Sequence, residues 1–567
     1  MSRQKASTEY ITEPQKTEGP SRLTTLSLKI FRSPASGLSK RMPKIRRALL
    51  KSGTRTPPEN YLSVVILLTV LAIPVSLTGI FIFYITLGFT YGLFLLLIPP
   101  VVFLAGLAKP WLSYSSKAKA VDTELPYVVS YFSLLSGGGI SLLVTLRRIS
   151  RVRLFPVLSK EAKQILTDID MTGMDPVSAL EQASRSTPNK YLADFLSGYT
   201  TLLRAGGQLG SYMDAKIREI FTHRVMSMKS SSGTISLYAE AYVAATVVMG
   251  LSFYLIFTMQ SIVNQTGLTG LSNAIFFSSV FIPMISIVFF YLVDLAQVKT
   301  EPSSTFPLFK AVSLGLIAVP IMIFIPLDLP LYVRVGVGLM LLSVPPMIKY
   351  ERESRVRRSI ESMLPNFLRD IAEVRKTGLS PERCIQQVSK RNYGRLSQYV
   401  QKMSSQIGWG VPIRRVMENF ANSIKVWSAK AVTFILLEVV DLGGGTAKMF
   451  ENIAEFTQQM KEIAKEQSST LKPLIFVPYF GAVMMITATM MMMNFMVGST
   501  GEMAGSDPAF IHTALLTGVV AQSWIMGFAS GKMGDGSMGA GFKHSIALSA
   551  ISIVTIFILQ FSLSGGL

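Results

Sequence analysis

Long apolar stretches alternate with polar segments along this chain, and the alternation occurs twice. Each of the two units opens with a pair of apolar stretches, continues with a long basic segment and closes with a second pair, and a ninth apolar stretch ends the chain. The nine stretches are residues 62–88, 90–108, 233–262, 272–296, 306–327, 330–348, 473–498, 508–530 and 544–565. Each is close to or above the roughly 20 residues that a helix needs to cross a ~30 Å hydrocarbon core. The pattern therefore predicts a polytopic membrane protein with about nine transmembrane helices.

The two basic segments, residues 114–230 and 349–472, have the pattern of helices. Apolar side chains recur at spacings of three and four residues, as at Phe367, Ile371 and Val374. This spacing places them on one face of an α-helix, whereas the alternation typical of half-buried strands is rare here. We expect an all-α fold in which each segment forms a helical bundle.

The two basic segments also match each other. Short patterns return in the same order and at a nearly constant offset along the chain. The pairs are Leu125-Pro126 with Leu364-Pro365, Gly139-Ile140-Ser141 with Gly378-Leu379-Ser380, Asp175-Pro176 with Val411-Pro412, and Gly206-Gly207 with Gly443-Gly444. A constant order with small changes in spacing indicates a diverged duplication. Because each unit has an even number of spans, the two homologous domains would form a parallel internal repeat, unlike the inverted repeats of many transporters.

The distribution of charge gives the expected orientation. Net charge is +9 over residues 1–60, +5 over 114–230 and +8 over 349–472, whereas the remainder of the chain totals −1. Positively charged segments stay on the cytoplasmic side of a membrane. All three segments are therefore expected in the cytoplasm, with the N-terminus inside the cell and the C-terminus outside.

These observations predict eight consecutive segments. They are a basic cytoplasmic N-terminal segment (1–60), transmembrane helices 1–2 (62–108), a first cytoplasmic domain (114–230), helices 3–4 (233–296), helices 5–6 (306–348), a second cytoplasmic domain (349–472), helices 7–8 (473–530) and helix 9 (544–565). Within the first segment, residues 42–51 form a basic amphipathic stretch, which either lies on anionic headgroups or contacts a cytoplasmic partner.

The motifs that could indicate catalysis lack the required context. Residues 534–539 fit GxGxxG, but a dinucleotide site needs a preceding strand and a βαβ unit, and this motif connects two predicted spans. Residues 527–533 are close to a P-loop, but they have three residues between the two glycines instead of four, and a methionine stands where the Mg²⁺-binding hydroxyl should be. Cys384 is the only cysteine and the three histidines are scattered, which argues against a disulfide or a structural metal site. We expect no enzymatic activity, cofactor or metal.

The predicted spans contain few ionisable residues. Glu240, Asp294 and Lys310 lie near cytoplasmic ends, and Gln522 is the most deeply placed polar side chain. Ionisable residues at mid-membrane usually mark a transport path. The alternative interpretation, a solute or ion transporter with cytoplasmic regulatory domains, is therefore disfavoured, as is a membrane sensor, which would need an outer ligand domain. Asn264 begins a glycosylation sequon in a predicted outer loop.

Two arginine pairs are candidates for partner docking. Arg357 and Arg358 follow the sixth predicted span, where they either anchor the helix at the membrane or bind a partner. Arg414 and Arg415 lie far from any predicted span in sequence, so membrane anchoring does not explain them. They either bind an acidic partner or are ordinary solvated charges. No recognition motif or aromatic platform accompanies the positive charge, so nucleic acid is not expected.

Glycines at corresponding places in the two domains are expected to be structural. Gly139 and Gly378 form one set, and a second set consists of Gly206, Gly207, Gly443 and Gly444. Glycine adopts positive φ readily and has no Cβ, so it permits tight turns and close helix packing.

A duplicated helical domain with a Leu-Pro start, a Gly-x-Ser turn and a Gly-Gly turn resembles the type II secretion system F domain. The nine-span layout, the long basic N-terminal segment and the final loop over residues 531–544 are most similar to the archaeal branch, which includes platform proteins of the archaellum and of archaeal type IV pili.

The resemblance implies a non-catalytic platform in the cell membrane that assembles a filament. A hexameric cytoplasmic secretion ATPase would dock on the two domains, and pilin or archaellin subunits would enter from the lipid bilayer. The family also makes a homodimer an expectation. The four arginines named above are the hypothetical ATPase-docking residues.

Overall fold

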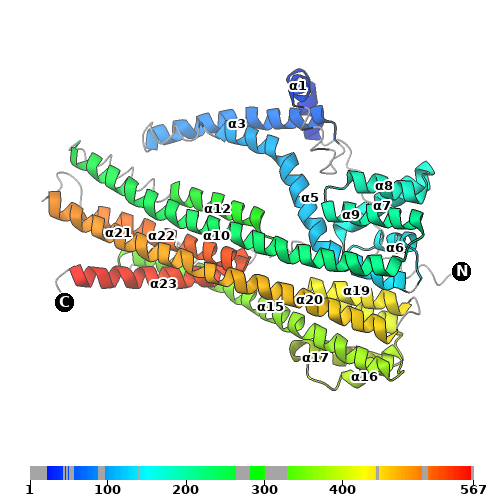
Figure 1. The fold of residues 1–567 in the computed structure, drawn as a ribbon. Helices are drawn as coiled ribbons and strands as arrows, with labels where there is room; N and C mark the ends of the chain where they lie inside the picture. Colours follow the sequence, from blue (N-terminus) through cyan, green and yellow to red (C-terminus); the bar gives the residue numbers. More distant parts are fainter. Residues whose placement is uncertain are drawn as a thin grey trace. The chain divides into compact units, whose positions relative to one another are not determined.

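The computed structural model is built from helices (Figure 1). It describes residues 22–42, 45, 49, 56–86, 96, 98–137, 139–263, 281–299, 328–441, 446–500 and 508–563. No strand occurs within these ranges. The prediction of an all-α fold is confirmed over this part of the chain.

The helices of the first half are α1 (Arg22–Arg41), α3 (Pro58–Thr86), α5 (Ile98–Gly137), α6 (Leu142–Ile149), α7 (Pro156–Thr172), α8 (Pro176–Ser186), α9 (Lys190–Ala205), α10 (Leu209–Val263) and α12 (Ile282–Ala296). Those of the second half are α15 (Leu331–Lys376), α16 (Pro381–Val388), η3 (Gly394–Leu396), α17 (Ser397–Gly408), α18 (Ile413–Ser423), α19 (Trp427–Asp441), α20 (Ala447–Leu471), η4 (Lys472–Ile475), α21 (Phe476–Thr500), α22 (Pro508–Gly534) and α23 (Met538–Leu563).

The order of helices repeats as the sequence patterns do. Helix α16 has the same length as α6, at 8 residues, and α18 has the same length as α8, at 11 residues. The equivalent of α5 is α15, that of α7 is α17, that of α9 is α19, and that of α10 is α20. The duplication therefore extends from short sequence patterns to whole helices.

Contacts divide the chain into two compact units. The first comprises residues 1–222 and 434–445, and the second comprises 223–433 and 446–567. The division does not follow the predicted segment boundaries, because the end of α19 belongs to the first unit.

Local signals in the first unit place the helix ends. Asp175 caps α8 by accepting hydrogen bonds from two backbone N–H groups, and Pro176 occupies the first helical position. Asn189 caps α9 through Leu192 N. Gly173 ends α7 in the left-handed conformation, as is typical of helix C-termini.

The N-terminal helix packs on the first apolar helix. Ser27 of α1 and Ser63 of α3 share a buried hydrogen bond of 3.0 Å. Of the predicted amphipathic stretch 42–51, Ile45 and Leu49 are buried in a cluster with Leu62. These two apolar side chains of the stretch therefore contact protein.

Five helical segments are long and apolar enough to cross a membrane within the described residues, and Ile282–Ala296 is a shorter apolar helix. The five are Pro58–Phe81, Leu331–Lys376, Ala447–Asn494, His512–Gly534 and Met538–Ser562. The predicted span 306–327 lies outside the described residues, and 62–88, 90–108, 272–296 and 544–565 are described only in part. The count of nine remains a prediction.

Glycines pack α22 against α23 in the second unit. A Cβ at Gly527 would collide with the backbone of Ser545, and one at Gly531 would collide with the backbone of Gly541. Small residues spaced four apart let two helices approach closely. This hairpin also packs on α15 and α21, which gives the ninth predicted span a place in the bundle.

Candidate docking surfaces on the two helical domains

Long helices join the apolar segments to the helical domains. Helix α15 runs without interruption from Leu331, through the predicted sixth span, to Lys376 in the second domain. Figure 1 shows α20 and α21 as a second long path, with only the short η4 between them. Helix α10 joins the first domain to the third predicted span over 55 residues. Helix α5 is likewise continuous, from the second predicted span into the first domain.

A largely buried group of polar side chains lies within the first unit. The Nη1 atom of Arg148 lies 2.5 Å from the Oε2 atom of Glu438, and the hydroxyl of Tyr131 donates to the same oxygen at 3.1 Å. Phe434, one turn before Glu438, packs its ring 5.4 Å from that of Tyr131. Burial and the charge of Glu438 raise the pKa of Tyr131, so its hydroxyl stays protonated and donates. Glu438 belongs to the second sequence repeat and its partners to the first, so this group joins the two repeats.

A second buried acid positions α7. Glu124 is 1% exposed, and its carboxylate accepts hydrogen bonds from Val157 N and Leu158 N at the start of α7. Phe155, the residue at the N-cap position, has no capping side chain, so Glu124 satisfies these donors instead. Burial raises the pKa of Glu124 to about 7, although the two backbone hydrogen bonds lower it in part. The second repeat has Met363 at the corresponding position.

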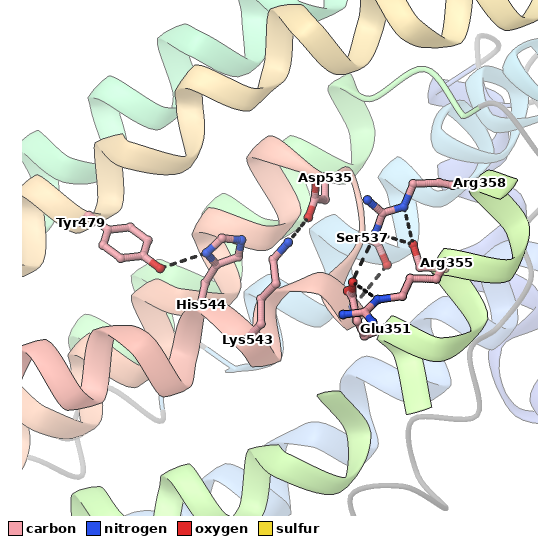
Figure 2. Close-up of polar contacts among 10 residues, drawn as sticks. Glu351, Arg355, Arg358, Tyr479, Asp535, Ser537, Lys543 and His544 are labelled. Carbon is pink, nitrogen blue, oxygen red and sulfur yellow. Dashed lines mark hydrogen bonds and ion pairs between the residues drawn. The ribbon is translucent and has the colours of Figure 1, made fainter. Parts of the chain in front are cut away.

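The first predicted arginine pair lies on α15, just beyond the apolar part of the helix. Arg358 donates a hydrogen bond to Ser354 Oγ. Its guanidinium also lies 3.8 Å from the carboxylate of Glu351, and the same carboxylate forms an ion pair of 3.0 Å with Arg355 (Figure 2). Arg357 is half-buried, whereas Arg358 is exposed. This surface of α15 is therefore basic and partly ordered by Glu351.

The second predicted pair lies on a different helix. Arg414 and Arg415 occupy the first turn of α18 and are both exposed. Arg414 forms an ion pair of 3.2 Å with Glu418, one turn further along the same helix. The two arginine pairs thus belong to separate helices of the second domain.

The predicted structural glycines fall into three groups. Gly139, Gly206 and Gly378 have φ values of 78°, 68° and 85°, which L side chains rarely adopt. Gly207 has no positive φ, but a Cβ there would lie 2.5 Å from Leu202 Cδ1. Gly443 and Gly444 lie outside the described residues.

The GxGxxG sequence has a packing explanation. It closes the turn between α22 and α23, and the preceding element is a helix, not a strand. A Cβ would collide with Ile475 at Gly534, with Gln297 at Gly536 and with Tyr350 at Gly539.

Polar contacts stabilise the turn between α22 and α23. Figure 2 shows Lys543 reaching Asp535, at 2.9 Å, and His544 reaching Tyr479. Lys532, the lysine of the incomplete P-loop pattern, is buried and lies 2.5 Å from Asp294. The glycines and the lysine of both motifs are therefore engaged in packing and ion pairing.

Three neutral polar side chains form a hydrogen-bonded group within the apolar bundle. Gln522 donates to Ser286 Oγ at 3.2 Å, and Ser286 shares a hydrogen bond of 3.0 Å with Tyr242. Among the described residues, no group of three or more His, Cys, Asp or Glu side chains could hold a metal ion.

The sequence patterns missed several residues that the fold brings together or exposes. Tyr131 and Arg148 contact Glu438, which belongs to the other sequence repeat, and no spacing of residues along the chain indicates such a contact. Trp409 is largely exposed to solvent, and its position between Gly408 and Gly410 was the available signal.

Comparison with known proteins identifies the domain. Residues 128–257 and 367–493 match the family model for the type II secretion system protein F. The two matches are separated by nearly the same interval as the repeated sequence patterns. The chain carries two copies of this domain and belongs to the type II secretion system protein F family.

The chain also has a relative of similar length. The chain is 22% identical over 507 residues to an uncharacterized protein of Methanocaldococcus jannaschii, covering 82% of this chain and 84% of the relative. No solved structure matches the chain.

Proposed function

We propose that this protein is the membrane platform of an archaeal type IV pilus-like machine, either an archaellum or a pilus. In this role it has no catalytic activity of its own. It docks a hexameric cytoplasmic secretion ATPase and transmits the motion of that ATPase to pilin or archaellin subunits in the bilayer.

The observation that carries this proposal is the continuity of the helices between the apolar segments and the domains. Helix α15 extends over 46 residues, which is about 69 Å at 1.5 Å per residue, more than twice the thickness of a hydrocarbon core. A helix that continues from a domain into the membrane transmits a displacement without an intervening flexible loop. The F domain itself supports assignment to a secretion or pilus machine.

Two further points support the archaeal and topological parts of the proposal. The relative of similar length comes from Methanocaldococcus jannaschii, an archaeon. The excess positive charge lies in residues 1–60 and in the two domains, which favours a cytoplasmic position for all three.

We assign ATPase docking to the second domain, with Arg357 and Arg358 as its basic contacts. They lie on α15, the same helix that continues into the apolar bundle, so a force applied there reaches the membrane directly. Arg414 and Arg415, the other docking candidates, lie on α18 close in sequence to the exposed Trp409 and form a second basic surface.

Co-purification tests the assignment. The variant Arg357→Glu with Arg358→Glu should reduce recovery of the secretion ATPase of the same organism by about 10-fold, because reversing charges at a docking surface weakens association. The matched control, Arg383→Glu with Lys390→Glu, makes the same charge change elsewhere in the second domain and should leave recovery unchanged. Undiminished recovery with the first variant would refute the assignment.

A further inference from the structure

The two most exposed large apolar side chains among the described residues occupy equivalent turns of the two domains. Met171 and Trp409 are each 82% exposed. Met171 lies in the last turn of α7, and Trp409 directly follows α17. A left-handed glycine follows each of them, Gly173 at φ 66° and Gly410 at φ 78°. The duplicated domain thus presents an apolar side chain to solvent at the same turn in both copies.

The turn of the first domain is acidic. Asp168 and Asp170 precede Met171, and Asp175 follows it. No lysine or arginine occurs between residues 164 and 184. We call Asp168, Asp170, Met171 and Asp175 the acidic turn.

The turn of the second domain is basic. Arg414 and Arg415 follow Trp409, and no aspartate or glutamate occurs between residues 403 and 417. We call Trp409, Arg414 and Arg415 the basic turn. Equivalent turns of one duplicated domain have therefore acquired opposite charge around an exposed apolar side chain.

Three of these charges oppose the dipoles of the helices that carry them, whereas Asp175 caps the start of α8, where a negative charge is favourable. Asp170 lies in the last turn of α7, where a negative side chain is unfavourable, and Arg414 and Arg415 lie in the first turn of α18, where a positive one is unfavourable. The local ion pairs, Arg147 with Asp170 at 3.4 Å and Arg414 with Glu418 at 3.2 Å, are exposed and therefore weak. Helix stability does not account for the charges of Asp170, Arg414 and Arg415, whereas a binding role does.

We propose that the acidic turn of one chain binds the basic turn of a second copy of the same chain. Opposite charges steer the two surfaces together and disfavour pairing of like turns. The thioether of Met171 and the indole of Trp409 suit each other, because sulfur packs favourably against aromatic rings and tryptophan is enriched at the centres of interfaces. This inference concerns self-association and does not depend on docking of an ATPase.

Charge reversal in the full-length chain, purified in detergent without any ATPase, tests the pairing. One variant carries Arg414→Glu with Arg415→Glu, and the other carries Asp168→Lys with Asp170→Lys. Each gives both turns the same sign, so each alone should self-associate at least about 10-fold more weakly in sedimentation equilibrium. An equimolar mixture of the two variants should recover the association, because every negative turn of one variant then finds a positive turn of the other.

The design separates association from folding. Both reversals bring the charges into agreement with the helix dipoles, so the melting temperature should not fall. Trp409→Ala, which leaves the charges intact, should also weaken association, whereas the control Arg383→Glu with Lys390→Glu should not.

Three results would overturn the proposal. The first is unchanged association of both charge-reversed variants. The second is a loss that the mixture does not restore, which would indicate a contact within one chain. The third is lost ATPase recovery with Arg414→Glu and Arg415→Glu while self-association stays intact, which would assign the basic turn to the ATPase.

Discussion

Arg148 and Glu438 form an ion pair of 2.5 Å between the two sequence repeats, far apart along the chain. Arg148 lies in the last turn of the short helix α6, and Glu438 comes from α19, whose final residues belong to the first unit. Tyr131 donates to the same carboxylate oxygen. The first unit is therefore complete only with a helix end that the second repeat supplies.

Replacing Glu438 should destabilise the first unit. Glu438→Ala leaves the guanidinium of Arg148 and the hydroxyl of Tyr131 without their acceptor in a largely buried site, at a cost of about 2–3 kcal/mol in the free energy of unfolding. Thermal unfolding of the detergent-purified protein measures this loss. Glu418→Ala, which removes only the exposed partner of Arg414, is the control and should change stability by less than about 0.5 kcal/mol. Equal effects of the two substitutions would show that the buried pair has no special role.

Glu124 should make the stability of the first unit depend on pH. Its pKa is raised from 4.5 to about 7 in the folded state, so the folded state binds the proton more tightly than the unfolded state. The stabilisation is full below about pH 4.5 and is lost as the pH rises to about 7, by on the order of 3 kcal/mol in total. Melting temperature should therefore fall between pH 5 and pH 8.

Glu124→Gln provides the comparison for that pH series. The amide oxygen can still accept from Val157 N or Leu158 N but does not ionise. The variant should lack the part of the pH dependence that falls between pH 5 and pH 7. A pH profile identical to that of the unmodified protein would show that Glu124 does not titrate in this range.

The glycine contact between α22 and α23 should not tolerate a side chain. Gly531→Ala places a Cβ against the backbone of Gly541, so the two helices must separate. We expect a loss of at least about 2 kcal/mol, measured as a lower melting temperature. Gly233→Ala in α10, where a Cβ would meet nothing within 4 Å, should be neutral or stabilising by up to about 1 kcal/mol. Equal tolerance of both substitutions would contradict close packing of the hairpin.

At the turn glycine Gly378, the cost of a substitution should come from the backbone conformation and not from steric crowding. Gly378→Ala forces alanine into φ 85° with no steric clash nearby, at a cost of about 1–2 kcal/mol in the free energy of unfolding. Gly408→Ala in the second domain has open space and no positive φ, so it should not destabilise. Thermal unfolding of the two variants distinguishes them, and a stable Gly378→Ala would show that the positive φ is not required.

The helical class and the duplication were predictable from sequence because both rest on local signals. Periodic apolar residues such as Phe367 and Ile371 place a helix, and the left-handed Gly139 and Gly378 recur at corresponding places in the two repeats. The family model found the same two repeats.

The sites were less predictable because they depend on tertiary contacts. The contact between Arg148 and Glu438 needs a helix end from the other repeat, and no local spacing encodes it. The exposure of Trp409 also depends on what the neighbouring helices leave uncovered. The arginine pairs could be proposed as docking residues from charge alone, but only the structure shows that they lie on two different helices, α15 and α18.

The most direct test of the central claim is reconstitution of the platform with its motor. The full-length protein in detergent is mixed with the hexameric secretion ATPase of the same organism and fractionated by size-exclusion chromatography. The account predicts that the two proteins co-elute, and that Arg357→Glu with Arg358→Glu shifts the ATPase to its free position while the melting temperature of the platform is unchanged. Separate elution of the folded, unmodified protein and the ATPase would contradict the account.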